Sequence, residues 1–279
     1  GFRIVGGMIE GLSSWMDSKG YKTLPDVIGR AIPNTVNWND LNINFSHKAV
    51  IDQEKCIKCG KCFNQCPYHA ISKIERPCAA ACGMDALTQL LESYVSTKAS
   101  PMTDALALSG LEYVAAGLLP SVENGAHDIE ARSHMAYGAL LSGITLANAG
   151  LGVVHGYAGP LGGYHPIPHG VVCGTLIGEA TRVTIEELFK DAEKNRIALR
   201  KYAKAGSILA RQHPVSLQHD CDLLVRTLND WIARTGIPRL GRYGLQKGDL
   251  AAILDKTNGK NSPATLSRAQ MAAILEARL

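Results

Sequence analysis

The sequence lacks the features that mark nucleic-acid-binding, membrane-spanning or secreted proteins. It has no tract of five basic residues, and its net charge is only +4 over 279 residues, which disfavours nucleic acid or an anionic membrane surface as a partner. No apolar run reaches the ~18 residues of a membrane-spanning helix, and the N-terminal residues show no signal-peptide pattern. We therefore predict a cytoplasmic protein that binds neither nucleic acid nor a membrane.

Internal repeats, low-complexity tracts and a dinucleotide-binding fingerprint are also absent. The nearest glycine pattern, GLGVVHG over residues 150–156, lacks the G-x-G-x-x-G spacing and follows an expected helix instead of a strand. These glycines are better suited to a close approach of the backbone around a loop. The sequence thus predicts no nucleotide-binding fold in this chain.

Cysteine is present in an informative pattern. The run CIKCGKCFNQCP has the spacing C-x2-C-x2-C-x3-C-P, which predicts a [4Fe–4S] cluster held by Cys56, Cys59, Cys62 and Cys66. Pairs spaced C-x2-C also bind zinc, but the third cysteine and the C-x3-C-P ending favour the cluster. Four cysteines in such a motif within a chain of this size indicate a reducing compartment.

The sequence does not decide which cysteine is the fourth ligand of this cluster. In two-cluster ferredoxins the fourth cysteine of such a run binds the other cluster, and no second run follows here. Either Cys78 or Cys82 acts as a remote fourth ligand, or Cys66 takes that role, or the site is incomplete. The two later cysteines, Cys173 and Cys221, are predicted to pack as small hydrophobic residues.

Hydrophobic periodicity predicts a mainly α protein with two parts. Residues 1–77 are expected to hold a helix pair (5–17 and 24–32) and a small α+β ferredoxin-like segment with strands at 49–53 and 69–74. Residues 78–279 are expected to form a multi-helix domain. Its helices are predicted at 84–96, from Ser100 onward, at 129–149, 184–212, 220–234 and 248–256, and after a capping box of Ser267 and Gln270. Gly236 and Pro238 should end a helix, and residues 159–170 should form a rigid loop.

Four side chains in the helical part are candidate metal ligands. Asp85 and Gln89 are four residues apart and therefore share a helix face. His155 follows the glycine-rich stretch, and His169 lies between prolines and a glycine in PIPHG. One carboxylate, one amide oxygen and two imidazoles would suit Fe²⁺ or Zn²⁺.

From about Cys82 to Leu279 the chain resembles the C-terminal helical domain of the iron-containing (group III) alcohol dehydrogenases, which has a dehydroquinate synthase-like helical fold. The matching stretches are GMDALTQLLESYVSTKASPMTDALAL, LANAGLGVVHGYAGPLGG, PHG and KNSPATLS. The resemblance implies a catalytic Fe²⁺ or Zn²⁺ at Asp85, Gln89, His155 and His169, where Gln89 replaces a histidine of the family. A second family histidine, near the substrate, is replaced by Gly159.

The same resemblance implies an oxidoreductase that interconverts a small alcohol and an aldehyde or ketone with NAD(P). The metal would act as a Lewis acid on the alcohol oxygen while hydride passes to the nicotinamide. In the family a separate α/β domain carries the nucleotide, so a partner chain is expected to supply that domain here. A homodimer is a further expectation for a helical bundle with uncovered faces.

Residues 1–75 resemble the C-terminal iron–sulfur tail of the NAD-dependent dihydropyrimidine dehydrogenase iron–sulfur subunit. The match lies in GFRIVGGMIEGLSSWMDSKGYKTLPDVIGRAIPN and continues through the cysteine run. Two alternatives to the dehydrogenase hypothesis follow. The chain could be a non-catalytic iron–sulfur electron-transfer module, or an inactive chimeric fragment whose helices fold but bind nothing.

Overall fold

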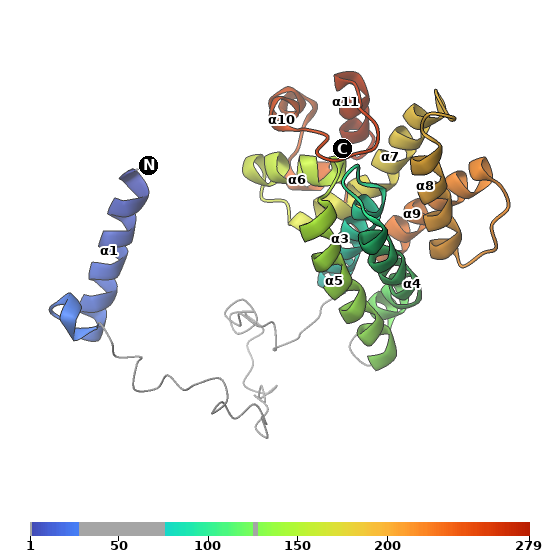
Figure 1. Cartoon of the computed structure of the whole chain (residues 1–279). Coiled ribbons are helices and arrows are strands. Elements are labelled where there is room, and N and C mark those ends of the chain that lie inside the picture. Colours follow the sequence, from blue (N-terminus) through green and yellow to red (C-terminus); the bar gives the residue numbers. More distant parts are fainter. Residues whose placement is uncertain (1, 28–75, 125–127) are drawn as a thin grey trace. The chain divides into compact units, whose positions relative to one another are not determined.

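The computed structural model describes residues 2–27, 76–124 and 128–279 of the chain (Figure 1). The chain divides into two compact units, Gly1–Ile71 and Ser72–Leu279. The described residues of both units form helices and turns, and none of them lies in a β-strand, which confirms the mainly α class. The expected strands and the four cysteines of the C-x2-C-x2-C-x3-C-P run lie outside the described residues, and the predicted boundary near residue 77 stays a prediction.

The first unit contains one long helix in its described part. Helix α1 covers Phe2–Lys19, which confirms the predicted helix over 5–17, and ends at Gly20. Gly20 has a φ of 73°, a left-handed conformation that glycine adopts without strain. A short 3₁₀ helix, η1 (Leu24–Asp26), follows; the rest of the predicted helix 24–32 lies largely outside the described residues.

The second unit is a bundle built around two central helices, α3 (Arg76–Val95) and α7 (His169–Phe189). These two pack against each other; α3 also contacts α4 and α5, and α7 also contacts α6, α9 and α11 (Figure 1). The surrounding helices are α4 (Pro101–Glu123), α5 (Ile129–Ala149), α6 (Val153–Tyr164), α8 (Arg196–Ala210), α9 (Leu217–Thr235), η5 (Leu240–Tyr243), η6 (Lys247–Asp249), α10 (Leu250–Lys256) and α11 (Arg268–Glu276).

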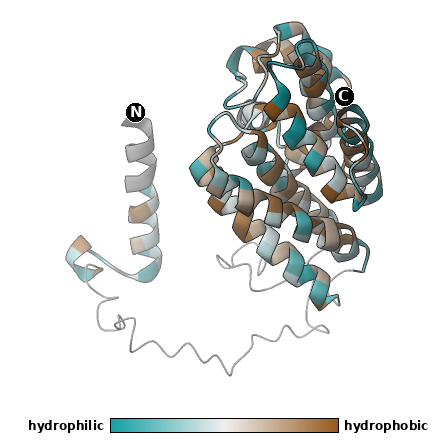
Figure 2. Cartoon of the chain, turned by 45° about the vertical axis from the view of Figure 1, so that its right-hand side comes forward, coloured by the Kyte–Doolittle hydropathy of each residue, from teal (hydrophilic) through white to brown (hydrophobic). Residues whose placement is uncertain are grey.

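Apolar side chains from most of these helices form one core. Leu87 and Leu90 of α3 are fully buried, as are Leu176 of α7 and Leu199 of α8. Figure 2 shows hydrophobic residues in brown recurring along the packed helices. Burial of apolar surface at about 25 cal/mol per Å² is the main force that holds such helices together. This core fixes the relative positions of α3, α6 and α7.

Local signals in the sequence correctly set three helix ends. The Ser100 side chain accepts a hydrogen bond from Thr103 N–H and Pro101 opens α4. Ser267 and Gln270 form the predicted capping box of α11. Gly236 ends α9 in a left-handed conformation, with a φ of 71°. Each of these features joins residues only a few positions apart, so the sequence alone suffices to predict it.

Two predicted elements are wrong. The single helix expected over 184–212 is split, because α7 ends at Phe189 and α8 begins at Arg196. The Asn195 side chain donates to the Leu188 carbonyl at 2.9 Å, which satisfies an acceptor at the end of α7 and helps hold the turn. The predicted loop 159–170 is mostly helical: α6 continues to Tyr164, and α7 begins at His169.

Helix α6 forms despite a proline and several glycines. Residues 153–158 and Leu161 of α6 are all buried, so the first half of the helix is enclosed by the helices around it. Burial of these residues compensates for Pro160, which supplies no backbone donor inside the helix. The connection between α6 and α7 is thereby reduced to residues 165–168, which places the start of α7 close to α6.

Helix α4 is the one described single helix that is long and apolar enough to cross a membrane by length and composition. The bent pair of α5 and α6 passes the same test together, with an angle of 98° between the two helices. In α4, 44% of the most apolar window is buried inside the helical unit. That burial is typical of a core helix, and the absence of a membrane partner stays a prediction.

Candidate metal centre

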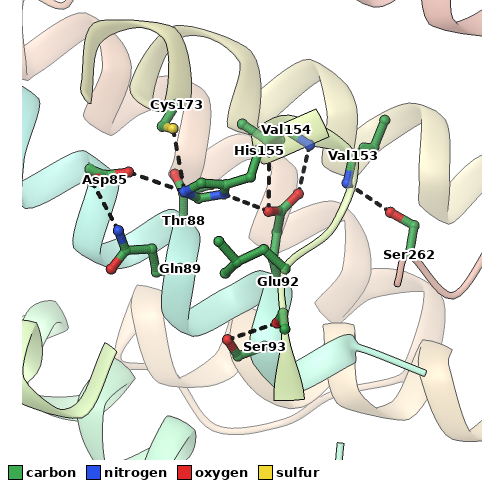
Figure 3. Close-up of polar contacts among 12 residues, drawn as sticks. Asp85, Thr88, Gln89, Glu92, Ser93, Val153, Val154, His155, Cys173 and Ser262 are labelled. Atoms are coloured by element: carbon green, nitrogen blue, oxygen red, sulfur yellow. Dashed lines mark hydrogen bonds and ion pairs between the residues drawn. The ribbon is translucent and has the colours of Figure 1, made fainter. Parts of the chain in front are cut away.

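Three helices bring together four side chains that could bind a metal ion. Helix α3 contributes Asp85, α6 contributes His155 in its first turn, and α7 contributes His169 at its first residue and Cys173 one turn later. One potential ligand atom from each of these residues lies within 4.8 Å of all the others. Figure 3 shows Asp85, His155 and Cys173 converging from different helices.

The distances between these atoms are those of a compact cluster. Asp85 Oδ1 lies 3.3 Å from His155 Nε2 and 3.6 Å from His169 Nε2. Cys173 Sγ lies 3.6 Å from the Nε2 atoms of both histidines. The His155 side chain is 4% exposed and that of His169 is 55% exposed. The cluster therefore has a buried side at His155 and an open side at His169.

Glu92 fixes the orientation of His155. Its Oε2 atom lies 2.7 Å from His155 Nδ1, and its Oε1 atom accepts a hydrogen bond of 2.7 Å from Val154 N–H (Figure 3). The Ser262 hydroxyl accepts from Val153 N–H at 2.9 Å. Side chains thus satisfy the first backbone donors of α6. A carboxylate on Nδ1 leaves the Nε2 lone pair for a metal.

Gln89 contacts Asp85 instead of facing the histidines. Its side-chain amide donates to Asp85 Oδ2 at 3.0 Å, and its oxygen accepts from the Ser142 hydroxyl at 2.8 Å. Because a carboxylate oxygen can only accept here, the contact with Asp85 sets which end of the amide faces it. Gln89 thereby holds Asp85 with its Oδ1 atom toward the two histidines.

Two glycines allow the helices to approach this closely. A Cβ atom on Gly170 would lie 2.4 Å from the Ala81 carbonyl oxygen of α3, and one on Gly152 would lie 2.8 Å from Glu92 Oε1. By contrast, a Cβ on Gly159, the position of a family histidine, would meet nothing within 4 Å. The glycines that border the site are therefore required by contacts between helices.

Opposite charges dominate the electrostatics of the site. Burial alone would raise the pKa of Asp85, but the neighbouring His155, Cys173 and His169 side chains outweigh burial and lower this pKa. Burial also opposes protonation of His155, yet its contacts with the Asp85 and Glu92 carboxylates raise its pKa to about 9. The carboxylates on either side of His155 thus favour a positive charge between them, which a proton on His155 or a bound metal ion can supply.

The residues present fit a divalent metal ion. Asp85 Oδ1 is buried and receives no hydrogen bond of good geometry among the described residues. A buried carboxylate oxygen that receives no hydrogen bond lowers the stability of the folded protein unless a cation binds it. With two imidazole nitrogens and a thiol sulfur beside it, the donor set suits Zn²⁺ or Fe²⁺ better than Mg²⁺ or Ca²⁺.

The structure brings three of the four predicted metal residues, Asp85, His155 and His169, to one point. It places the fourth, Gln89, against Asp85. Sequence reasoning missed Glu92 and assigned Cys173 to packing alone. Both lie at helical spacing from predicted residues: Glu92 follows Asp85 by seven positions, and Cys173 follows His169 by four. That spacing was the signal by which the sequence could have indicated them.

Of the predicted cluster cysteines, Cys56, Cys59, Cys62 and Cys66 lie outside the described residues. The candidate remote ligands Cys78 and Cys82 lie on α3, with their Sγ atoms 4.0 Å apart. Neither forms a disulfide in the described part of the chain. The choice of the fourth cluster ligand stays a prediction with the alternatives given above.

Comparison with protein families identifies two segments. Residues 79–279 match the C-terminal domain of the Fe-containing alcohol dehydrogenase family. Residues 49–72, which contain the cysteine run, match the 4Fe-4S binding domain.

Curated relatives are similar to this chain over parts of their length. Alcohol dehydrogenase 4 of Schizosaccharomyces pombe is 34% identical over 177 residues, 63% of this chain and 39% of the relative. Lactaldehyde reductase of Escherichia coli is 42% identical over 176 residues, 62% of this chain and 43% of the relative. For 1,3-propanediol dehydrogenase of Citrobacter freundii the identity is 42% over 109 residues, 39% of this chain and 28% of the relative. The chain thus spans less than half the length of each of these relatives.

Solved structures share the helical fold. A 1,3-propanediol oxidoreductase aligns with a TM-score of 0.63 and 29% identity over 72% of this chain and 51% of its own. An alcohol dehydrogenase from Oenococcus oeni aligns with a TM-score of 0.66 and 26% identity over 76% of this chain and 54% of its own.

Proposed function

Because the chain belongs to the Fe-containing alcohol dehydrogenase family, we propose that its helical unit binds a divalent metal ion for the interconversion of a small alcohol with an aldehyde or ketone. The observation that carries this proposal is the buried Asp85 Oδ1 atom, which faces His155 and His169 at 3.3 and 3.6 Å and receives no hydrogen bond of good geometry from the described residues. Fe²⁺ or Zn²⁺ bound there would supply a Lewis acid that polarises a substrate oxygen.

The residues around the metal ligands have positioning roles. Glu92 accepts a hydrogen bond from His155 Nδ1–H and so keeps Nε2 available as a ligand. Gln89, predicted from the family pattern as a ligand, holds the Asp85 carboxylate by donating to Oδ2. His169 is more than half exposed, so a small substrate can reach the site from its side of the cluster.

The substrate class follows from the names of the relatives. They include enzymes named for 1,3-propanediol and lactaldehyde, which makes short diols and hydroxyaldehydes the first substrates to test. We propose NAD(P) as the hydride carrier, bound by a nucleotide domain from a partner chain. A cytoplasmic location and a homodimer remain predictions.

The metal site is tested by removing both histidines. The full chain carrying Cys56→Ser, Cys59→Ser, Cys62→Ser and Cys66→Ser, here called the cluster-free variant, should bind Zn²⁺ in a 1:1 ratio after dialysis. Adding His155→Ala and His169→Ala should abolish this binding, because both nitrogen ligands of the proposed site are lost. The measurement is zinc content by elemental analysis together with calorimetric titration.

The exposed His213 provides the matched control for this test, since it lies in the turn before α9. His213→Ala in the cluster-free variant should leave zinc binding unchanged. Full zinc occupancy after loss of both His155 and His169 would refute the site. Reduction of lactaldehyde by NAD(P)H, assayed with the separately produced N-terminal half of a relative, tests the activity itself.

The match of residues 49–72 to a 4Fe-4S binding domain favours a second function, electron transfer. We propose that Cys56, Cys59 and Cys62 bind a [4Fe–4S] cluster, with the fourth ligand among the alternatives named above. The dihydropyrimidine dehydrogenase-like origin of residues 1–75 is part of this proposal. Anaerobic reconstitution followed by dithionite should give the EPR signal of a reduced cluster, and Cys59→Ser should abolish it. A colourless protein after reconstitution would exclude the cluster.

A further inference from the structure

Cys173 lies in the proposed metal site at a position that neither the family pattern nor the sequence prediction assigns to a ligand. It is fully buried on α7, one turn after His169. Its Sγ atom is 3.6 Å from His155 Nε2 and 3.6 Å from His169 Nε2. We propose that Cys173 is the fourth protein ligand, in place of Gln89, and that the site therefore favours Zn²⁺; this inference rests on the proposed function.

The distances support a tetrahedral arrangement. Metal bonds of ~2.0–2.1 Å to nitrogen or oxygen and ~2.3 Å to sulfur give tetrahedral edges of about 3.4 Å for N···O and about 3.6 Å for N···S. Both N···S edges in this cluster are 3.6 Å, and the two N···O edges are 3.3 and 3.6 Å. All four measured edges thus lie close to those of one tetrahedron, to which a substrate oxygen would add as a fifth ligand from the exposed side at His169.

Gln89 is engaged elsewhere. Its amide nitrogen faces Asp85 Oδ2 and its oxygen faces the Ser142 hydroxyl, so both ends of the amide have partners away from the histidines. Turning the amide oxygen toward Asp85 would place two acceptors 3.0 Å apart and remove the donor from Oδ2. Gln89 is therefore a positioning residue for Asp85.

A thiolate changes the charge and the metal preference of the site. Binding of the metal would release two protons to solvent, one from the Cys173 thiol and one from His155 Nε2. Asp85 and the thiolate together then carry the two negative charges that balance a divalent ion. Because soft sulfur ligands favour Zn²⁺ over Mg²⁺ or Mn²⁺, we expect zinc to compete effectively for this site.

The test uses Co²⁺ as a spectroscopic substitute for Zn²⁺ in the cluster-free variant, which removes the four cysteines of the iron–sulfur motif. Co²⁺ should give a near-ultraviolet thiolate-to-metal charge-transfer band. Cys173→Ser should abolish this band and weaken Co²⁺ binding at least about tenfold. Loss of a residue that only hydrogen-bonds to a metal ligand already lowers metal affinity about 10–100-fold. X-ray absorption of the zinc-loaded cluster-free variant should show one sulfur at ~2.3 Å, a readout that needs no substitution at Cys173.

Three control variants test whether the band comes from Cys173. Cys221→Ser removes an equally buried thiol that donates to the Leu199 carbonyl, and Cys78→Ser removes a thiol of the α3 pair; the band should survive both substitutions. Gln89→Ala should also keep the band.

Two results would refute Cys173 as a ligand and leave the proposed function intact. One is Co²⁺ binding that depends on His155 and His169 but lacks the band, and the other is a band that persists in Cys173→Ser. Absence of any Co²⁺ or Zn²⁺ binding would refute both the Cys173 ligand and the proposed function.

Discussion

Replacing Gly170 with alanine is expected to destabilise the helical unit and to weaken metal binding together. The added Cβ would lie 2.4 Å from the Ala81 carbonyl oxygen, a backbone atom that cannot move without shifting α3. Overpacking of this kind typically costs about 1–3 kcal/mol. Because α7 carries His169 and Cys173 while α3 carries Asp85, separation of the two helices also separates the ligands. Denaturant unfolding and Zn²⁺ titration of the cluster-free variant measure the two effects.

Gly163 is the matched control for this substitution. It lies in α6, and a Cβ placed on it would meet nothing within 4 Å. Gly163→Ala should therefore leave metal affinity unchanged and should alter stability only through helix propensity, by up to about 1 kcal/mol in the favourable direction. Equal unfolding curves and equal zinc affinity for Gly170→Ala and the parent protein would contradict the close approach of α7 to α3.

Replacing Glu92 with glutamine should lower metal affinity without removing a ligand. One carboxylate serves two donors, since Oε1 accepts from Val154 N–H and Oε2 faces His155 Nδ1. Glutamine keeps the size but offers one acceptor and one donor group, so one of these partners would meet an NH₂ group. We expect a 10–100-fold loss of zinc affinity and a decrease of about 1–3 kcal/mol in the free energy of unfolding.

Zinc affinity by competition with a chelator and unfolding by denaturant measure these two quantities. Glu112→Gln is the control, because Glu112 is an exposed carboxylate on α4; it should change neither quantity. If Glu92→Gln binds zinc as tightly as the parent protein, then the carboxylate does not orient His155. Such a result would leave Asp85, His155 and His169 in place as ligands but remove the argument for their preorganisation.

Sequence reasoning predicted the helical character of the second unit and several of its helix ends. Ser100, Ser267 and Gly236 act on backbone groups within a few residues, so their effect depends little on the rest of the fold. The same reasoning failed at α6, where Pro160 and neighbouring glycines suggested a loop. There the burial of Tyr157 and Leu161 decides the structure, and burial depends on helices distant in the sequence.

The candidate site divides in the same way. Asp85, His155 and His169 could be predicted because each lies in a stretch that resembles a known family. For Cys173 and Glu92 the sequence offered only their helical spacing from His169 and Asp85, since a buried thiol and a buried carboxylate acquire a role only when α3, α6 and α7 meet. Gln89 shows the converse: its place in the family pattern suggested a ligand, while its hydrogen bonds with Asp85 and Ser142 indicate a supporting role.

The sequence by itself determined that this chain has a helical unit of the Fe-containing alcohol dehydrogenase family, because periodicity, caps and motifs are properties of short segments. Its resemblance to that family predicted Asp85, His155 and His169 as candidate metal ligands. Only the tertiary structure decided which atoms surround the site. Packing α6 against α7 brings Cys173 Sγ to 3.6 Å from His155 Nε2. These two residues come from different helices, so the distance between them is set by how the helices pack.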